Sequence, residues 1–281
     1  MSGTIGGLSP ATLYLQISKN EPADVTRFES YDPATKAAIA RFQQQAPALT
    51  TPDALLKDYR SLQVVLGAFN MSADIGDTAL LKQLMTQNPS DSSSLARTSG
   101  NPSYLQFARA MSTWQPPPLS NAQSVASIVT QFATNNFEAS EGQQNAGLQQ
   151  ALYFRRMIGS VTSIDQLMSD PTLTNVAVIG SGLPQQFGLL DYSQQVPILT
   201  QAIDLTKFHD PAYVDRFVEK YFAESQLSQS GSTTNATGIL SLFSGSGATQ
   251  GTDLLSTLFG SASSGSGQST TLLGALFSTT A

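Results

Sequence analysis

The 281-residue chain contains no cysteine, so disulfides, thiolate metal ligands and cysteine nucleophiles are excluded. It has one histidine, and its charged residues make up 12% of the total, roughly half of the usual share of about 25%. The net charge is −6, whereas a nucleic-acid binder needs a basic face to displace the counterions of phosphates. The composition therefore argues against a nucleic-acid partner.

Long apolar runs are also missing. No run approaches the length of about 18 residues that indicates a membrane span. The first seven residues, 1–7, contain no Lys or Arg and lack the pattern of a secretory signal. We therefore expect no membrane span, and a protein that is cytoplasmic or is exported without a cleavable signal.

Helix-start signals are what the sequence does contain. Asn or Asp followed by Pro recurs along the chain, and Ser-Pro and Thr-Pro occur in the same way. The polar side chain can accept a hydrogen bond from a free amide, and proline fits the first turn of a helix. These pairs are Ser9-Pro10, Asp32-Pro33, Thr51-Pro52, Asn88-Pro89, Asn101-Pro102, Asp170-Pro171 and Asp210-Pro211. Asn88-Pro89 is ambiguous, because Asp91 offers a second cap nearby.

Apolar residues spaced three and four apart follow most of these starts and predict helices. The expected helices cover residues 33–45, 53–70, 80–85, 104–111, 121–158 with a kink or break near Gly142 and Gly147, 170–179 and 214–222. Val176 to Ile179 is read as the end of a helix, with a strand as the alternative. The prediction is an all-α protein with a helical extension at 1–50, a helical body at 51–226 and a Ser/Gly-rich tail at 227–281.

The tail is expected to be flexible, because its composition buries too little apolar surface to offset the ordering entropy. It carries three short Leu/Phe motifs, each too short to form an isolated helix. Their candidate partner-binding residues are Leu240, Phe243, Leu255, Phe259, Leu273 and Phe277. Three weak contacts on one chain can act together through avidity. The alternatives are a plain spacer and a motif that packs back onto the body.

No catalytic, cofactor or metal site is predicted. His209 is read as a surface histidine at a helix entry, since no second metal ligand is arranged around it. Glu138 and Glu141 could act as paired carboxylates, but polar surface or pairing with Arg155 or Arg156 is the preferred interpretation. The two arginines could bind a phosphate or an acidic partner, or cover the edge of the core with their alkyl stems.

Three further features have structural interpretations. Gly180-Ser181-Gly182 lacks the Lys and Ser/Thr of a phosphate-binding loop and is read as a helix stop. Ser140 and Ser181 have no nucleophile-elbow context. Trp114, before three consecutive prolines, is expected to anchor the core.

Two groups of segments resemble a bacterial family catalogued as domain of unknown function 1217. The first includes Ala68-Phe69-Asn70-Met71 and Tyr104-Leu105-Gln106-Phe107-Ala108. The second includes Phe137-Glu138-Ala139-Ser140-Glu141-Gly142-Gln143-Gln144-Asn145, Ala151-Leu152-Tyr153-Phe154-Arg155-Arg156 and Leu167-Met168-Ser169-Asp170-Pro171-Thr172-Leu173. The resemblance covers about residues 53 to 225.

Members of this family are helical and are commonly encoded among flagellar genes, and no catalytic residues are carried over from them. The resemblance implies a non-enzymatic structural or assembly protein of the bacterial flagellum, with flagellar proteins as partners. The alternative is a cytoplasmic export chaperone or regulator that holds a partner helix.

Overall fold

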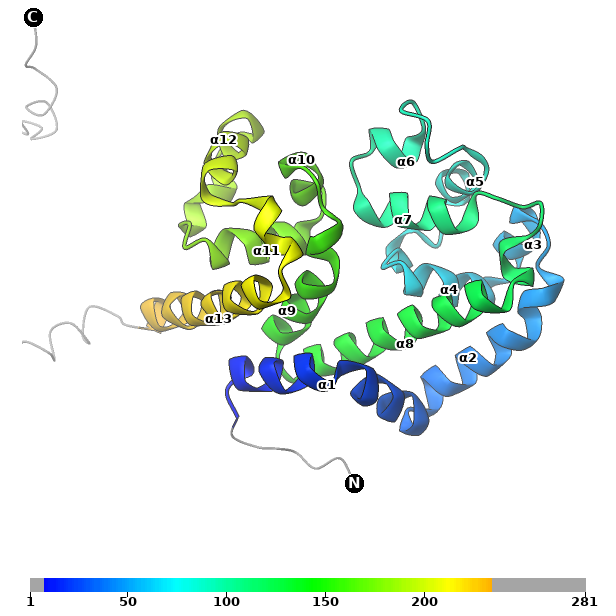
Figure 1. Ribbon diagram of the computed structural model, residues 1–281, viewed down its shortest axis with the longest axis horizontal. Coiled ribbons are helices and arrows are strands. Elements are labelled where there is room, and N and C mark those ends of the chain that lie inside the picture. The colour runs from blue at the N-terminus through cyan, green and yellow to red at the C-terminus, as the bar shows by residue number, and fades with distance from the viewer. Residues whose placement is uncertain (1–7, 234–281) are drawn as a thin grey trace, which may run out of the picture. The chain divides into compact units, whose positions relative to one another are not determined.

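The computed structural model describes residues 8–233, which are helical and contain no strand (Figure 1). The chain divides into two units, Met1–Leu227 and Ser228–Ala281. The α-helices are α1 Pro10–Tyr31, α2 Pro33–Gln45, α3 Pro52–Lys57, α4 Tyr59–Ala68, α5 Thr78–Thr86, α6 Leu95–Thr98, α7 Pro102–Met111, α8 Ala122–Gln144, α9 Ala146–Met157, α10 Ile164–Met168, α11 Pro171–Gly180, α12 Tyr192–Ala202 and α13 Pro211–Thr233. The predicted all-α class is confirmed.

Short 3-10 helices connect several of these elements. They are η1 Ala46–Ala48, η2 Ser72–Asp74, η3 Pro118–Ser120, η4 Ile158–Ser160, η5 Gln185–Leu189 and η6 Leu205–His209. No helix within residues 8–233 is long and apolar enough to cross a membrane. The Leu/Phe motifs of the tail, which contain Phe243, Phe259 and Phe277, lie outside the described residues.

The predicted helix starts are confirmed at all but one of the X-Pro pairs. Pro occupies the first position of α1, α2, α3, α7, α11 and α13, and the preceding side chain accepts a hydrogen bond from an amide of the first turn. Asn88-Pro89 is the exception, since Asn88 accepts from the amide of Ser90 in a turn. The next helix, α6, begins only at Leu95.

The single helix predicted over 53–70 is wrong, because the chain breaks at Asp58. Asp58 has φ −91° and ψ 85°, and its side chain accepts from the amide of Ser61 to begin α4. Leu55, Leu62 and Leu66 are buried as the apolar stripe predicted. The break rotates Tyr59 outward, so that it is 61% exposed rather than part of the stripe.

The break predicted near Gly142 and Gly147 is confirmed and falls at Asn145. The backbone of Asn145 is extended, and its side chain accepts from the amide of Leu148 to cap α9. The close packing of the two helices explains why Gly142 is needed, since a Cβ there would lie 2.8 Å from the Cβ of Gln149.

Helices α4 and α11 end in the same backbone motif. In α11, Gly182 has φ +74°, the Gly182 amide donates to Ile179 and the Leu183 amide donates to Val178. This Schellman arrangement satisfies carbonyls that the helix end leaves free, and glycine tolerates the positive φ. The interpretation of Val176 to Ile179 as the end of a helix, and of residues 180–182 as its stop, is confirmed.

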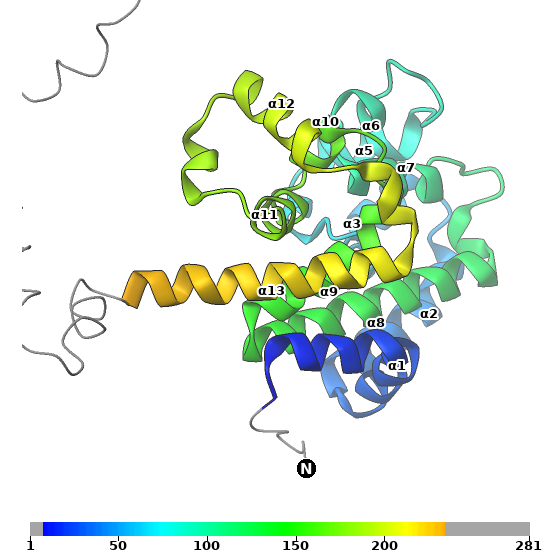
Figure 2. The ribbon, with the colours of Figure 1, turned by 60° about the vertical axis from the view of Figure 1, so that its left-hand side comes forward.

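Helix α8 is the central element of the first unit. It packs against α4, α9 and α1, while α9 also packs against α11 and α1 (Figures 1 and 2). Helix α13 closes the core over α9 through rings: Phe217 stacks on Phe154 at 5.5 Å and meets the edge of Phe208 at 5.0 Å. One hydrophobic core therefore extends from Tyr14 of α1 to Phe222 of α13.

Helix α1 is kinked where proline interrupts it. Pro22 has no amide hydrogen and cannot bond the carbonyl of Ser18, and Asn20 leaves the helical region with φ −131°. The freed Ser18 carbonyl accepts instead from Nη2 of Arg155 at 3.4 Å. The kink thus presents a backbone acceptor to a side chain of α9.

Candidate functional site

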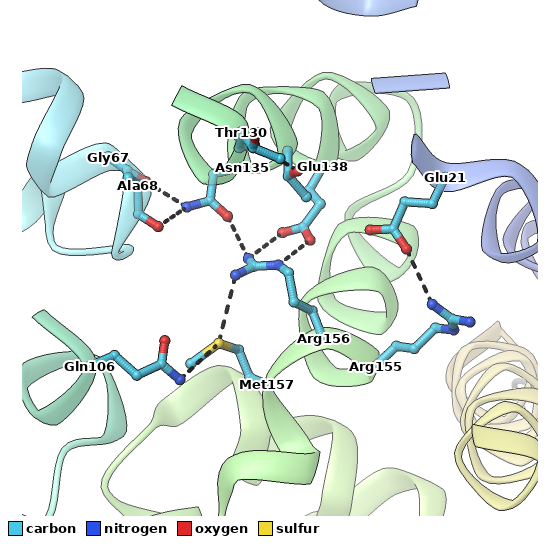
Figure 3. Close-up of polar contacts among 11 residues, drawn as sticks. Glu21, Gly67, Ala68, Gln106, Thr130, Asn135, Glu138, Arg155, Arg156 and Met157 are labelled. Atoms are coloured by element: carbon cyan, nitrogen blue, oxygen red, sulfur yellow. Dashed lines mark hydrogen bonds and ion pairs between the residues drawn. The ribbon is translucent and has the colours of Figure 1, made fainter. Parts of the chain in front are cut away.

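An ion pair with a buried carboxylate joins α8 and α9 (Figure 3). Arg156 binds Glu138 through two parallel hydrogen bonds, from Nε to Oε1 at 2.8 Å and from Nη2 to Oε2 at 2.9 Å. The Glu138 side chain is 3% exposed. Burial lowers the pKa of Arg156, but the hydrogen bond and charge of Glu138 outweigh it, so the net shift is upward. The pair is therefore charged and specifically oriented.

Asn135 extends this ion pair to α4. Its Oδ1 accepts from Nη2 of Arg156, and its Nδ2 donates to the carbonyls of Gly67 at 2.5 Å and Ala68 at 3.0 Å. These carbonyls lie in the last turn of α4, where the Gly67 carbonyl also accepts from the amide of Asn70 at 3.4 Å. One polar network, defined by Arg156, Glu138 and Asn135, therefore fixes α9, α8 and the end of α4 against one another.

Arg155 makes a second set of contacts on the neighbouring face of α9. It binds Asp215 of α13 at 3.1 Å and Glu21 of α1 at 3.2 Å. Tyr14 of α1 also donates to Asp215, at 2.7 Å. Burial and the charge of Glu138 raise the pKa of Glu21, although Arg155 opposes the rise. The two adjacent arginines thus connect different groups of helices.

A polar pocket of about 420 Å³ lies beside the ion pair. Its walls come from the turn after α4, the first turns of α7 and α11, and the facing sides of α8 and α9. The lining residues are Asn70, Met71, Asp74, Asn101, Ser103, Tyr104, Asn135, Glu138, Gln149, Gln150, Tyr153, Ser169, Asp170, Pro171 and Thr172. Amide, hydroxyl and carboxylate groups predominate, so the pocket suits a small hydrogen-bonding group or a polar side chain.

The acidic groups of the pocket are held by other groups of the chain. Asp170 accepts from the amides of Thr172 and Leu173 as the cap of α11, and from the Tyr153 hydroxyl at 2.5 Å. Burial and the charge of Asp170 raise the pKa of Tyr153. Asp74 accepts from the hydroxyl of Tyr104 at 3.2 Å. The carboxylates therefore position helices and phenol groups.

Of the two alternatives predicted for Glu138, pairing with an arginine is confirmed, with Arg156 as the partner, and the polar surface does not apply because Glu138 is buried. Glu141 is only partly buried, and burial together with the charge of Asp24 raises its pKa. Both arginines direct their guanidinium groups into ion pairs within the chain. The ion pairs of Arg155 with Glu21 and Asp215 were not among the interpretations drawn from the sequence.

The other singled-out residues occupy structural positions. His209 is exposed at the end of η6, directly before α13, as predicted. Trp114 donates from Nε1 to the carbonyl of Met85 at 3.1 Å, which fits the predicted anchor. The Ser181 hydroxyl is buried without a hydrogen-bond partner. Residues 8–233 contain no group of three or more His, Cys, Asp or Glu side chains that could hold a metal.

Sequence reasoning missed Asn135 and the bond between Tyr153 and Asp170. Asn135 was detectable as a polar residue on the apolar face of a helix, between Phe132 and Phe137. The bond between Tyr153 and Asp170 left no such signal, because the predicted role of Asp170 as a helix cap already accounted for its carboxylate.

The fold and the site define a class: an all-α protein with a polar pocket beside a buried, bidentate ion pair. The chain belongs to the family described as "Protein of unknown function (DUF1217)", whose model matches residues 68–214. The predicted family resemblance is thereby confirmed, while its flagellar association stays a prediction.

A solved structure supports the fold. The chain is similar to the crystal structure of protein AGR_C_984 from Agrobacterium tumefaciens, with a TM-score of 0.69 and 18% sequence identity. The match covers 77% of this chain and 93% of that one. At this identity the likeness concerns the fold alone. No curated protein matches the chain.

Proposed function

We propose that this chain is a non-enzymatic structural or assembly protein of the bacterial flagellum. The observation that carries the non-enzymatic part is the way the pocket's charged groups are used. Glu138 is held by Arg156, and Asp170 caps a helix and binds Tyr153. A general base is a proton acceptor that must come within reach of a substrate proton. These carboxylates instead accept hydrogen bonds from other groups of the chain.

The flagellar part of the proposal rests on the resemblance. The chain is a member of the DUF1217 family, and the resemblance implies that members of this family are commonly encoded among flagellar genes. The cysteine-free composition, with only 12% charged residues, also suits a protein that passes through an export channel. Flagellar proteins are the partners that this proposal implies.

An export chaperone or regulator is the second candidate, and a surface feature favours it. Leu189 is 86% exposed, Tyr192 is 56% exposed and Leu190 is 36% exposed, on the segment that ends η5 and begins α12. A protein that holds a partner helix needs accessible apolar side chains of this kind.

Deletion of the gene tests the motility proposal. We expect a deletion strain to lose swimming, with missing or abnormal filaments in electron micrographs, and a plasmid copy to restore both. Unchanged swimming with normal filaments would refute a flagellar role.

Fractionation of the complemented strain separates the two candidates. An antibody should detect a structural or assembly protein in purified basal bodies or in the culture supernatant. A chaperone or regulator should remain in the cytosol, and a Leu189→Ser/Tyr192→Ser variant of it should lose its function while remaining folded.

A further inference from the structure

A shallow hollow surrounds Tyr59, on the part of the surface formed by α2, α3 and the start of α4. It has a volume of about 460 Å³ and is lined by Arg41, Ala54, Lys57, Asp58, Tyr59 and Arg60. We refer to it as the Tyr59 hollow. The break at Asp58 creates it, because the change of direction turns Tyr59 and its cationic neighbours outward.

The charge of this region is opposite to that of the chain. The lining of the hollow contains three cations and one carboxylate, so it carries +2, whereas the whole chain carries −6. That carboxylate, Asp58, accepts from the amide of Ser61 as the cap of α4. The nearby Asp53 pairs with Lys82 at 2.9 Å, so these two charges offset each other.

The three cations of the hollow are available to a partner. Arg41, Lys57 and Arg60 are exposed, and none of them forms an ion pair within residues 8–233. By contrast, Arg156 is neutralised by the buried Glu138, and Arg155 by the partly buried Glu21 and Asp215. The hollow therefore combines unneutralised charge with accessible hydrogen-bond donors.

Tyr59 adds an apolar surface to this charge. Its ring is 61% exposed, so it contributes little to the core. Tyrosine and arginine are the residue types most enriched at the energetic centres of protein interfaces, where an aromatic ring packs and guanidinium groups bind carboxylates. An exposed tyrosine enclosed by three cations matches that composition.

We propose that the Tyr59 hollow binds an acidic segment of a partner protein, in which Asp or Glu residues flank an apolar or aromatic side chain. The carboxylates would bind Arg41, Lys57 and Arg60, and the apolar side chain would pack on Tyr59. A polyphosphate is a poorer fit, because nucleic-acid binding needs a continuous basic face and the remainder of this chain is acidic. The inference goes beyond the proposed function, since it does not require a flagellar partner.

The test measures binding of a fluorescein-labelled synthetic peptide, rich in Glu and carrying one Phe, by fluorescence anisotropy of the full chain. We expect saturable binding that weakens with salt. The variant Arg41→Gln/Lys57→Gln/Arg60→Gln should bind roughly tenfold more weakly, since exposed ion pairs contribute modestly and three of them are lost. Tyr59→Ala should also weaken binding.

The matched control removes the same charge elsewhere. Lys19, Arg109 and Arg216 are exposed cations without an ion pair among the described residues. Their triple substitution by Gln should leave peptide affinity within about threefold of the parent, since it changes only the net charge and long-range attraction is screened by salt. Equal losses in the two triple variants would show that only net charge matters and would overturn the proposal.

Three other results would also overturn it. These are absence of peptide binding by the parent chain, tighter binding of poly-U RNA than of the peptide, and self-association in sedimentation experiments that the triple hollow variant abolishes. If the triple hollow variant fails to fold by circular dichroism, the single charge reversal Lys57→Glu replaces it, with Lys19→Glu as its control. Because this assay does not involve motility, its outcome is independent of the gene-deletion result.

Discussion

Removing Arg156 tests whether the central ion pair is as buried as its geometry indicates. In Arg156→Met, Glu138 loses its bidentate partner in a site where its side chain is 3% exposed, and Asn135 loses the donor to its Oδ1. Breaking a buried pair by removing one partner costs about 3–5 kcal/mol, mainly because the remaining charge is uncompensated. We expect that decrease in the free energy of unfolding.

The assay is urea unfolding at pH 7, followed by circular dichroism and analysed by linear extrapolation. The double variant Glu138→Leu/Arg156→Met removes both charges and should recover most of the loss, to within about 1–2 kcal/mol of the parent. The difference between the single and double variants isolates the uncompensated charge from the loss of packing.

An exposed ion pair of the same molecule provides the control. Lys82 and Asp53 are 54% and 60% exposed, and Lys82→Met should cost only about 0–1 kcal/mol. If Arg156→Met costs no more than Lys82→Met, or if the double variant is no more stable than the single one, the account of the buried pair is refuted.

Three further changes have defined outcomes. Burial raises the pKa of Glu21, and a carboxyl whose pKa is higher in the folded state opposes folding when it is ionised. Glu21→Gln should therefore match the parent in stability below the unfolded pKa of about 4.3, and equal or exceed it at pH 7. A variant that is less stable than the parent at pH 7 would contradict this. A Cβ at Gly180 would lie 2.5 Å from Cε1 of Phe217, so Gly180→Ala should cost about 1–3 kcal/mol in urea unfolding, whereas Gly76→Ala, with nothing within 4 Å, should change stability by less than about 0.5 kcal/mol. Asp170→Ala should cost about 2–4 kcal/mol, because it removes a helix cap and leaves a buried phenol without its acceptor, and a thermal melt unchanged from the parent would disprove both roles.

Local chemistry made the helix boundaries predictable wherever a polar cap preceded proline. Ser9, Asp32 and Asn101 each supply the acceptor, and the proline that follows each of them fits the first turn, so no tertiary information was needed. The break at Asn145 was also predictable to within a few residues, because the glycines on either side of it weaken a continuous helix.

The break at Asp58 was not predictable from periodicity. The apolar stripe continues in register across it, since Leu55 and Leu62 are both buried. Only the tertiary packing of α3 and α4 decides that Asp58 caps a new helix. Hydrophobic periodicity indicates which residues face the core. Two short helices packed on the same core can show the same spacing of apolar residues as one long helix.

The candidate site was predictable only in part, for a geometric reason. Glu138 and Arg156 lie on consecutive helices joined by a tight connection, so their pairing follows from the local sequence. The polar pocket instead gathers residues from Asn70 to Thr172. Such a pocket forms only when five segments of the chain have packed together. The spacing of residues within any one segment therefore cannot predict it.

The contact between Tyr14 and Asp215 has a consequence for the order of folding. The two residues are 201 positions apart, and Arg155 joins the same cluster from α9. During synthesis at about 5–20 residues per second, α1 leaves the ribosome roughly 10–40 s before α13. Until then the tyrosine hydroxyl has no acceptor on α13. We therefore expect α1 to remain sensitive to proteases on a ribosome-bound chain that stops before Asp215, and to gain protection only when the last described helix arrives.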